Sequence, residues 1–74
     1  MKVEIYSKSN CPFCDKARHW FDSHGYEYTE HKMDEEEQRL AFYQRVPNAR
    51  SVPQIFIDDK LIGTYDQFIA IADT

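Results

Sequence analysis

The sequence predicts an α/β fold in which a four-stranded mixed sheet is flanked by three helices. Short segments in which apolar and polar residues alternate predict the strands, and segments with apolar residues at helical spacing lie between them. The sequence Asp58-Asp59-Lys60 is a turn signal that joins the last two strands as a hairpin. The resulting order is βαβαββα, and its first β-α-β unit implies two parallel strands with a right-handed crossover.

The first part of the chain supplies this β-α-β unit. A strand is expected over residues 2–7, where polar and apolar residues alternate. A helix is expected over residues 12–23, because proline is favoured at the first helical position and Gly25 is a typical stop just beyond the end. Residues 26–32 alternate again and predict the second strand. The residues expected on the buried face of the helix are Phe13, Ala17, Trp20, Phe21 and His24.

A second helix is expected to begin at Asp34, which has capping-box spacing with Glu37. The acidic residues of its first turn suit the positive end of the helix dipole. The helix is expected to end at Pro47-Asn48. Its buried face is expected to comprise Leu40, Ala41, Tyr43 and Val46.

The last part of the chain predicts a hairpin followed by a short helix. Strands are expected over residues 54–58 and 61–63, on either side of the turn. Thr64 and Gln67 repeat the capping-box spacing, so the final helix is expected over residues 65–72.

Composition limits the functions that this chain can have. Its 74 residues are expected to form a single domain over residues 1–74, and 42% of them are hydrophobic, which is enough for a packed core. The net charge of −4 argues against nucleic acid and against anionic membranes as partners. No run approaches the ~20 apolar residues of a membrane span, and the N-terminus does not resemble a secretory signal. We expect a cytoplasmic monomer.

Cysteine usage indicates redox chemistry or metal binding. The chain has only two cysteines, Cys11 and Cys14. Small secreted domains usually carry several bridges between distant segments. A bridge across two intervening residues closes a tiny loop and removes little chain entropy, so structural stapling explains this pair poorly.

The pair lies where a strand passes into a helix. If Pro12 is the first helical residue, Cys11 is the N-cap, and its sulfur faces the free N–H groups of Phe13 and Cys14. Those donors and the helix dipole stabilise a thiolate relative to a thiol.

Nearby charges act on this thiol in opposite directions. Lys8 adds positive charge, whereas Asp15 opposes it from further along the helix. We therefore expect the pKa of the Cys11 thiol to lie below its ordinary value. Cys14, expected to be more buried, can attack a mixed disulfide on Cys11 and release the bound thiol.

Half of a zinc site is the alternative interpretation of the pair. Cys11, Cys14, His19 and His24 are four potential ligands. Steps of five residues rotate about 140° around a helix axis, so Cys14 and the two histidines point in different directions. Zinc needs ligands that converge tetrahedrally, and the chain has no second Cys-x-x-Cys. Redox chemistry is favoured, and no metal site is expected.

The sequence resembles the glutaredoxins along nearly its whole length. Cys11-Pro12-Phe13-Cys14 resembles the Cys-Pro-Tyr/Phe-Cys active site of that family, and Lys8 stands where the family has a lysine. The segment Ser51-Val52-Pro53-Gln54-Ile55-Phe56-Ile57 resembles the Thr-Val-Pro segment and the strand after it. Ile62-Gly63-Thr64-Tyr65-Asp66 resembles the Gly-Gly-x-Asp turn. The resemblance implies a thioredoxin-like fold and dithiol oxidoreductase activity.

The resemblance also implies a ligand, glutathione, acting as co-substrate with no tightly bound cofactor. Pro53 would be cis and face the active site, which lets the backbone of Val52 pair with a peptide-like ligand as an added strand does. The residues implied at the glutathione site are Lys8 and Arg50 for the glycine carboxylate, the N–H groups of Tyr65 and Asp66 for the γ-glutamyl carboxylate, the Asp66 side chain for the amine, and Phe13 as an apolar wall.

Two positions depart from the family pattern. Thr64 replaces the second glycine of the turn and needs a negative φ, and Gln67 stands where many members have a second acid. The hydroxyl of Thr64 can cap the final helix and compete for an N–H group that glutathione would use.

Three functions are compatible with these residues. In the favoured one, Cys11 attacks a protein disulfide or a glutathionylated cysteine, Cys14 resolves, and glutathione restores the dithiol. A second is a thioredoxin-like electron donor, for instance to ribonucleotide reductase, recharged by a flavin reductase. A third is an iron–sulfur carrier in which two chains bridge one cluster through Cys11 and glutathione. The family's carriers typically lack Pro12 and Cys14, and both are present here.

Overall fold

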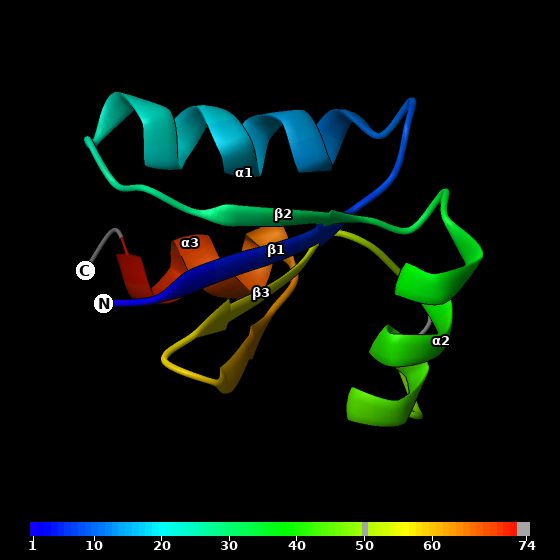
Figure 1. Ribbon diagram of the computed structural model, residues 1–74. Coiled ribbons are helices and arrows are strands. Elements are labelled where there is room, and N and C mark those ends of the chain that lie inside the picture. Colours follow the sequence, from blue (N-terminus) through cyan, green and yellow to red (C-terminus); the bar gives the residue numbers. More distant parts are fainter. Residues whose placement is uncertain (50, 73–74) are drawn as a thin grey trace.

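The computed structural model describes residues 1–49 and 51–72. Its elements follow the predicted order βαβαββα (Figure 1). Except for β2 and α2, their bounds agree with the prediction to within one residue. The elements are β1 (Val3–Ser7), α1 (Pro12–Ser23), β2 (Thr29–Lys32), α2 (Glu36–Arg45), β3 (Gln54–Ile57), β4 (Lys60–Gly63) and α3 (Tyr65–Ala72).

The strands form one sheet in the order β2-β1-β3-β4. β1 pairs with β2 in parallel and with β3 in antiparallel orientation, and β4 continues the antiparallel pairing from β3. The turn between β3 and β4 is the predicted one, and Asp58 and Asp59 adopt the positive φ angles of 51° and 67° that such a tight hairpin turn requires. The sheet is therefore the mixed four-stranded sheet that the sequence predicts.

The helices cover both faces of the sheet. Alternate residues of a strand point to opposite faces, so Ile5 and Tyr6 of β1 belong to different core clusters. α1 and α3 contribute to one cluster, whose buried members are Val3, Ile5, Ala17, Phe21, Ile55 and Phe68. α2, which stands apart from α1 and α3 in Figure 1, contributes to the other, whose buried members are Tyr6, Met33, Phe42 and Phe56. Every residue of β1 is buried as a result.

β2 is shorter than the predicted strand over residues 26–32. It begins at Thr29, which pairs with Glu4 near the start of β1. The N–H of Tyr26 donates to the carbonyl of Phe21 at 2.9 Å and so closes the turn after α1. Residues 26–28 thus belong to the connection, and the pairing with β1 begins only at Thr29 and Glu4.

The buried face of α1 differs in part from the expectation. Ala17 and Phe21 are fully buried as predicted, together with Cys14. Phe13 is 48% exposed, and His24 is an exposed residue at the C-cap. Residues 14, 17 and 21 share one side of the helix, so α1 turns Cys14 and not Phe13 toward the sheet.

The expected capping box of α2 is wrong. The helix begins at Glu36, and its N-cap residue Glu35 makes no side-chain cap bond. The carboxylate of Asp34 instead accepts hydrogen bonds from the N–H and the hydroxyl of Ser9, at 3.0 and 2.9 Å. The spacing assigned the Asp34 carboxylate to the start of the helix, but Ser9, which is distant in the sequence, bonds to it instead.

The predicted buried face of α2 is also wrong in part. Phe42 is the buried residue of this helix, whereas Leu40 is 58% and Tyr43 47% exposed. Ala41 is exposed, and Val46 is partly buried just beyond the helix end. The Phe42 ring lies 4.9 Å from that of Tyr6, centroid to centroid, so Phe42 is the buried apolar contact between α2 and the sheet.

An ion pair between a buried carboxylate and a partly exposed arginine joins β1 to the end of α2. Arg45 donates to both carboxylate oxygens of Glu4, at 3.1 and 3.0 Å, and to the Tyr6 hydroxyl at 3.0 Å. The Glu4 side chain is only 9% exposed, and the His31 ring lies 3.1 Å from the same carboxylate. The hydrogen bonds from Arg45 outweigh the effect of burial and hold the pKa of Glu4 below its ordinary value of 4.5.

This ion pair predicts how stability depends on acid pH. Because the pKa of Glu4 is lowered on folding, its contribution is complete above the ordinary value of 4.5 and is lost as pH falls through the folded value. Replacement of Arg45 by leucine leaves the buried carboxylate without its main donor and should cost about 2 kcal/mol at neutral pH. Urea unfolding of Glu4→Gln should show a shallower loss of stability than the wild type between about pH 5 and about pH 3.

Glu27→Gln is the matched control, since this exposed carboxylate precedes β2. Its stability should fall with decreasing pH as steeply as that of the wild type. Identical pH profiles for Glu4→Gln and Glu27→Gln would refute the role assigned to the Glu4–Arg45 pair.

Candidate active site

Cys11 is the N-cap residue of α1, as predicted. Its φ and ψ of −118° and 102° are extended, and its sulfur accepts a hydrogen bond from the N–H of Cys14 at 3.2 Å. The carbonyl of Cys11 accepts from the N–H of Asp15 at 3.1 Å, which begins the helical pattern. Pro12 occupies the first helical position, where its missing N–H is not needed. The helix terminus thus donates one hydrogen bond to the Cys11 sulfur, from the N–H of Cys14, whereas, within the described part of the chain, the expected bond from the N–H of Phe13 does not form.

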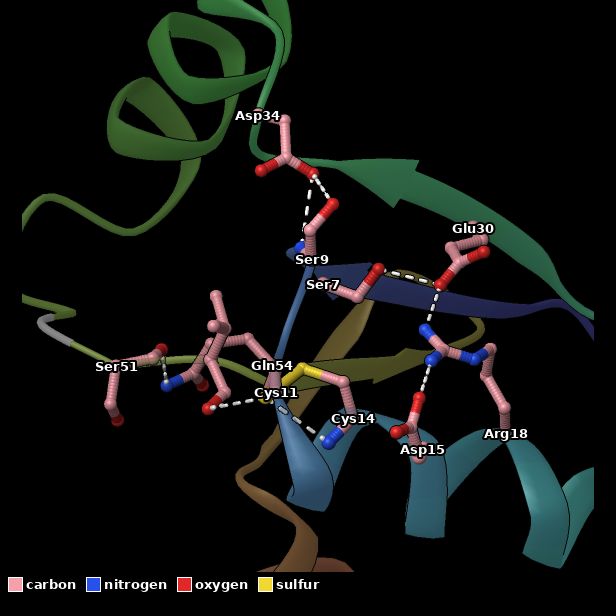
Figure 2. The surroundings of a disulfide bond; sticks show 11 residues. Ser7, Ser9, Cys11, Cys14, Asp15, Arg18, Glu30, Asp34, Ser51 and Gln54 are labelled. Carbon is pink, nitrogen blue, oxygen red and sulfur yellow. Dashed lines mark hydrogen bonds and ion pairs between the residues drawn. A yellow bond between two sulfur atoms is a disulfide. The ribbon is translucent and has the colours of Figure 1, made fainter.

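The loop before Cys11 is held by two local features. Asp34 accepts from both the N–H and the hydroxyl of Ser9, as Figure 2 shows. Asn10 has a φ of 59°, a left-handed conformation that asparagine tolerates better than most residues. Together they turn the chain from the end of β1 into the helix start at Cys11.

The two cysteines form a disulfide (Figure 2), with their Cα atoms 5.2 Å apart. Cys14 has no exposed surface, and Cys11 is 8% exposed. The structure therefore represents the oxidised state, in which Cys11 is the more accessible of the two residues. Opening of this bond leaves two thiols adjacent to each other, as exchange between a nucleophile and a resolving thiol requires.

The segment before β3 lies against the disulfide. The Val52–Pro53 peptide bond is cis, which agrees with the expectation. The carbonyl oxygen of Val52 is 3.8 Å from the sulfur of Cys11, and Pro53 is fully buried. Because Tyr6 pairs with Gln54, the residues that precede β3 lie beside the residues that follow β1. The sheet register therefore brings Val52 to Cys11.

A groove of about 200 Å³ along the Val52–Pro53 segment brings together most of the residues that the sequence singled out. It lies between the start of α1, the segment before β3 and the start of α3. The Phe13 and Tyr65 rings face each other across it, with centroids 6.2 Å apart. Its lining residues are Phe13, Ser51, Val52, Pro53, Thr64, Tyr65 and Asp66.

A second groove, of about 310 Å³, lies on the other side of Ser51 and Val52, which line both. Lys8 lies here and not in the first groove. Arg39 of α2 lines it as well, with its guanidinium bonded to the carbonyls of Met33 and Asp34 at 3.0 Å each. Sequence reasoning did not find Arg39, because an arginine in a polar helix gives no signal of its own. The expected Arg50 lies outside the described residues.

The turn into α3 accommodates Thr64. Gly63 has a φ of 118°, a backbone conformation that residues with a side chain rarely adopt, so this position favours glycine. Gln67 Oε1 accepts from the N–H of Thr64 at 2.9 Å and from its hydroxyl at 3.3 Å. Thr64 thus directs its hydroxyl to Gln67. Among the described residues, no side chain accepts from the N–H groups of Tyr65 and Asp66.

The remaining candidate ligands of a metal do not converge. His19 contacts the Ser23 hydroxyl at 3.3 Å, and His24 contacts the Trp20 carbonyl at 2.7 Å. Within residues 1–49 and 51–72, no group of three or more His, Cys, Asp or Glu side chains is arranged to hold a metal ion. In the same part of the chain, no helix is long and apolar enough to cross a membrane.

Comparison with known proteins identifies the family. The glutaredoxin profile matches residues 3–62. The chain belongs to the glutaredoxin family. A probable glutaredoxin from Synechocystis sp. is 44% identical over 71 residues, which are 95% of this chain and 81% of that protein.

Two solved glutaredoxins have the same fold. Glutaredoxin 1 from Francisella tularensis, solved with cacodylate, superposes with a TM-score of 0.84 at 37% identity, over 97% of this chain and 92% of that one. Buckwheat glutaredoxin, solved as a glutathione complex, superposes with a TM-score of 0.82 at 28% identity, over 96% and 67%. The chain therefore has the thioredoxin-like fold and is a thiol–disulfide oxidoreductase with a redox-active cysteine pair.

Exposure and capping predict unequal reactivity of the two cysteines. In the reduced chain, iodoacetamide near neutral pH should alkylate Cys11 at least ~10 times faster than Cys14, because only the Cys11 thiolate is both accessible and stabilised by the helix terminus. Mass spectrometry of peptides after short labelling measures the ratio. Equal labelling, or faster labelling of Cys14, would contradict this assignment.

Proposed function

We propose that this glutaredoxin is a glutathione-dependent reductase of protein disulfides and glutathione mixed disulfides, with Cys11 as nucleophile and Cys14 as resolving thiol. The observation that carries the proposal is the N-cap position of Cys11, whose sulfur lies 3.8 Å from the carbonyl oxygen of Val52, a residue that lines both grooves. A nucleophile in this position meets a peptide-like thiol compound aligned along the Val52 backbone.

The proposed reaction is a sequence of thiol–disulfide exchanges. The Cys11 thiolate attacks one sulfur of the substrate disulfide, forms a mixed disulfide, and displaces the other sulfur as a thiolate that takes up a proton. Cys14 then attacks the Cys11 sulfur, forms the Cys11–Cys14 disulfide and releases the second substrate thiol. Two glutathione molecules restore the dithiol and leave as one molecule of oxidised glutathione.

The charges on the two sides of Val52 suit the two ends of glutathione. Lys8 and Arg39 line the larger groove and can pair with the glycine carboxylate. The N–H groups of Tyr65 and Asp66 begin α3 beside the smaller groove and can hold the γ-glutamyl carboxylate. The Asp66 side chain can pair with the amine. The buckwheat glutaredoxin–glutathione complex, which shares this fold, supports the same ligand here.

The proposed domain organisation, location and partners follow from the same chemistry. We propose that residues 1–74 act as one glutaredoxin-like domain, as a monomer, with no tightly bound cofactor. A dithiol that must be returned to the reduced state suits a reducing compartment, so the cytoplasm is the proposed location. The proposed partners are glutathione and disulfide-containing or glutathionylated proteins, ribonucleotide reductase among them, and not nucleic acid or membranes.

A turnover assay with a small glutathione mixed disulfide tests the reductant. Glutathione with its reductase should support turnover, whereas a flavin reductase of the thioredoxin type offered alone should not. Lys8→Gln should raise the KM for the mixed disulfide roughly threefold with little change in kcat, as expected for loss of one exposed charge pair. Lys60→Gln, at the hairpin far from the grooves, is the control. Turnover with the flavin reductase and none with glutathione would favour the thioredoxin-like alternative.

Replacement of Cys14 by serine separates the two substrate classes. Cys14→Ser should keep part of the activity on glutathionylated substrates, since glutathione itself can resolve the Cys11 mixed disulfide. It should abolish reduction of protein disulfides, measured with a disulfide-bonded test protein. Cys11→Ser should lose both activities, and retention of either would refute the mechanism.

A further inference from the structure

Arg18 of α1 lies between two carboxylates next to the active site. Its guanidinium pairs with Asp15 on the first turn of the same helix and with Glu30 on β2, as Figure 2 shows. None of these residues takes part in the proposed exchange of disulfides. The cluster therefore needs an explanation of its own.

The position of the guanidinium is fixed from the sheet side. Glu30 accepts a hydrogen bond from the hydroxyl of Ser7 at 2.6 Å, and Ser7 is the buried last residue of β1. The side chains of Arg18 and Glu30 are 26% and 21% exposed. Burial alone would raise the pKa of Glu30, but the hydrogen bonds from Ser7 and Arg18 outweigh it and hold that pKa below its ordinary value. Glu30 is therefore ionised near neutral pH and anchors Arg18.

Asp15 is an acidic residue at a position where its negative charge disfavours the Cys11 thiolate. Its N–H is bonded to the carbonyl of Cys11, so it lies within the first turn of the helix that Cys11 caps. A carboxylate there stabilises the helix through the dipole. The same negative charge opposes ionisation of the neighbouring thiol and acts to raise its pKa. A cysteine that acts as a nucleophile needs the opposite effect, a lowered thiol pKa.

We propose that Arg18 is a positioning residue that neutralises Asp15, so that Cys11 keeps an acidic thiol although an acid occupies the first turn of its helix. Arg18 acts through Asp15 and does not contact the reacting sulfur. Glu30 and Ser7 hold the guanidinium in place from the sheet. This inference rests on the proposed role of Cys11 as the nucleophile.

Other charges around the active-site loop are separate from this cluster. Lys16 lies over the Phe13 ring, with its nitrogen 4.9 Å from the ring centroid, and Asp34 is bonded to Ser9. Lys8 and Asp66 line the two grooves. Among the described residues, the ion-pair partner of Asp15 is Arg18 alone.

The test is the pKa of Cys11 in the reduced full chain, taken from the pH dependence of its iodoacetamide labelling rate by peptide mass spectrometry. Arg18→Gln should raise this pKa by about half a unit, the effect of one uncompensated charge near the surface. Arg18→Lys should stay close to the wild type. Asp15→Asn should lower the pKa, and the double variant Arg18→Gln/Asp15→Asn should return it to near the wild-type value.

Lys60→Gln is the control for general loss of a cation, because Lys60 pairs with Ile57 at the end of the sheet opposite Ser7. It should leave the pKa of Cys11 unchanged. A folded Arg18→Gln variant with an unchanged pKa would overturn the proposal, even if its urea midpoint is lower, because Arg18 would then be only structural. Retention of the raised pKa in the double variant would also overturn it.

If Arg18→Gln does not fold, the pKa of Cys11 in Asp15→Asn is the deciding measurement. An unchanged Cys11 pKa in that variant overturns the proposal. Failure of the proposed function looks different. In that case Cys11→Ser would still reduce disulfides, whatever the pKa measurements give. The two failures can therefore be told apart.

Discussion

The hydrogen bond from the Cys14 N–H to the Cys11 sulfur, 3.2 Å long, is the interaction on which the rest of the site depends. It exists because Cys11 is the last non-helical residue and Pro12 the first helical one. A sulfur in that position receives the free donors of a helix terminus, which favour negative charge. The same bond places Cys14, the proposed resolving cysteine, behind Cys11, fully buried and within one turn.

The sheet serves to bring the other parts of the site to this helix start. β1 is buried on both faces, so its carboxyl end is a fixed point from which the active-site loop begins. The antiparallel pairing of Tyr6 with Gln54 sets Val52 beside that loop, and the parallel pairing of Ser7 with Lys32 sets Asp34 within reach of Ser9. α3 follows β4 directly and presents its first N–H groups next to Phe13. Each part of the site comes from a different element, and the register of the sheet fixes their distances.

The sequence predicts those features that depend on local signals. Pro12 and the cysteine before it predicted both the start of α1 and the cap, and the Asp58-Asp59 turn predicted the hairpin. The start of α2 could not be predicted in this way, because the carboxylate of Asp34 is taken by Ser9, which is 25 residues away in the sequence. The burial of Phe42 in place of Leu40 depends on which side of α2 meets Tyr6, and spacing within the helix does not determine that side.

The roles of charged residues are also hard to predict from local sequence signals. Lys8 was found from its position before Cys11, and Asp66 through the family resemblance, whereas Arg39 and Arg18 were not found at all. Arg39 matters only because α2 lies beside the Val52 segment, and Arg18 only because β2 places Glu30 opposite it. Both proposed roles follow from tertiary position. An isolated arginine on a helix is otherwise an ordinary solvated residue.

The central claim is that the Cys14 N–H stabilises the Cys11 thiolate. NMR titration of the reduced chain tests it directly, with the Cβ carbon of Cys11 and the backbone amide of Cys14 followed together. Cys11 should titrate well below the ordinary thiol value of about 8.5, and the Cys14 amide proton should shift downfield with the same midpoint. A Cys11 midpoint near about 8.5, with a Cys14 amide that does not follow it, would contradict the account.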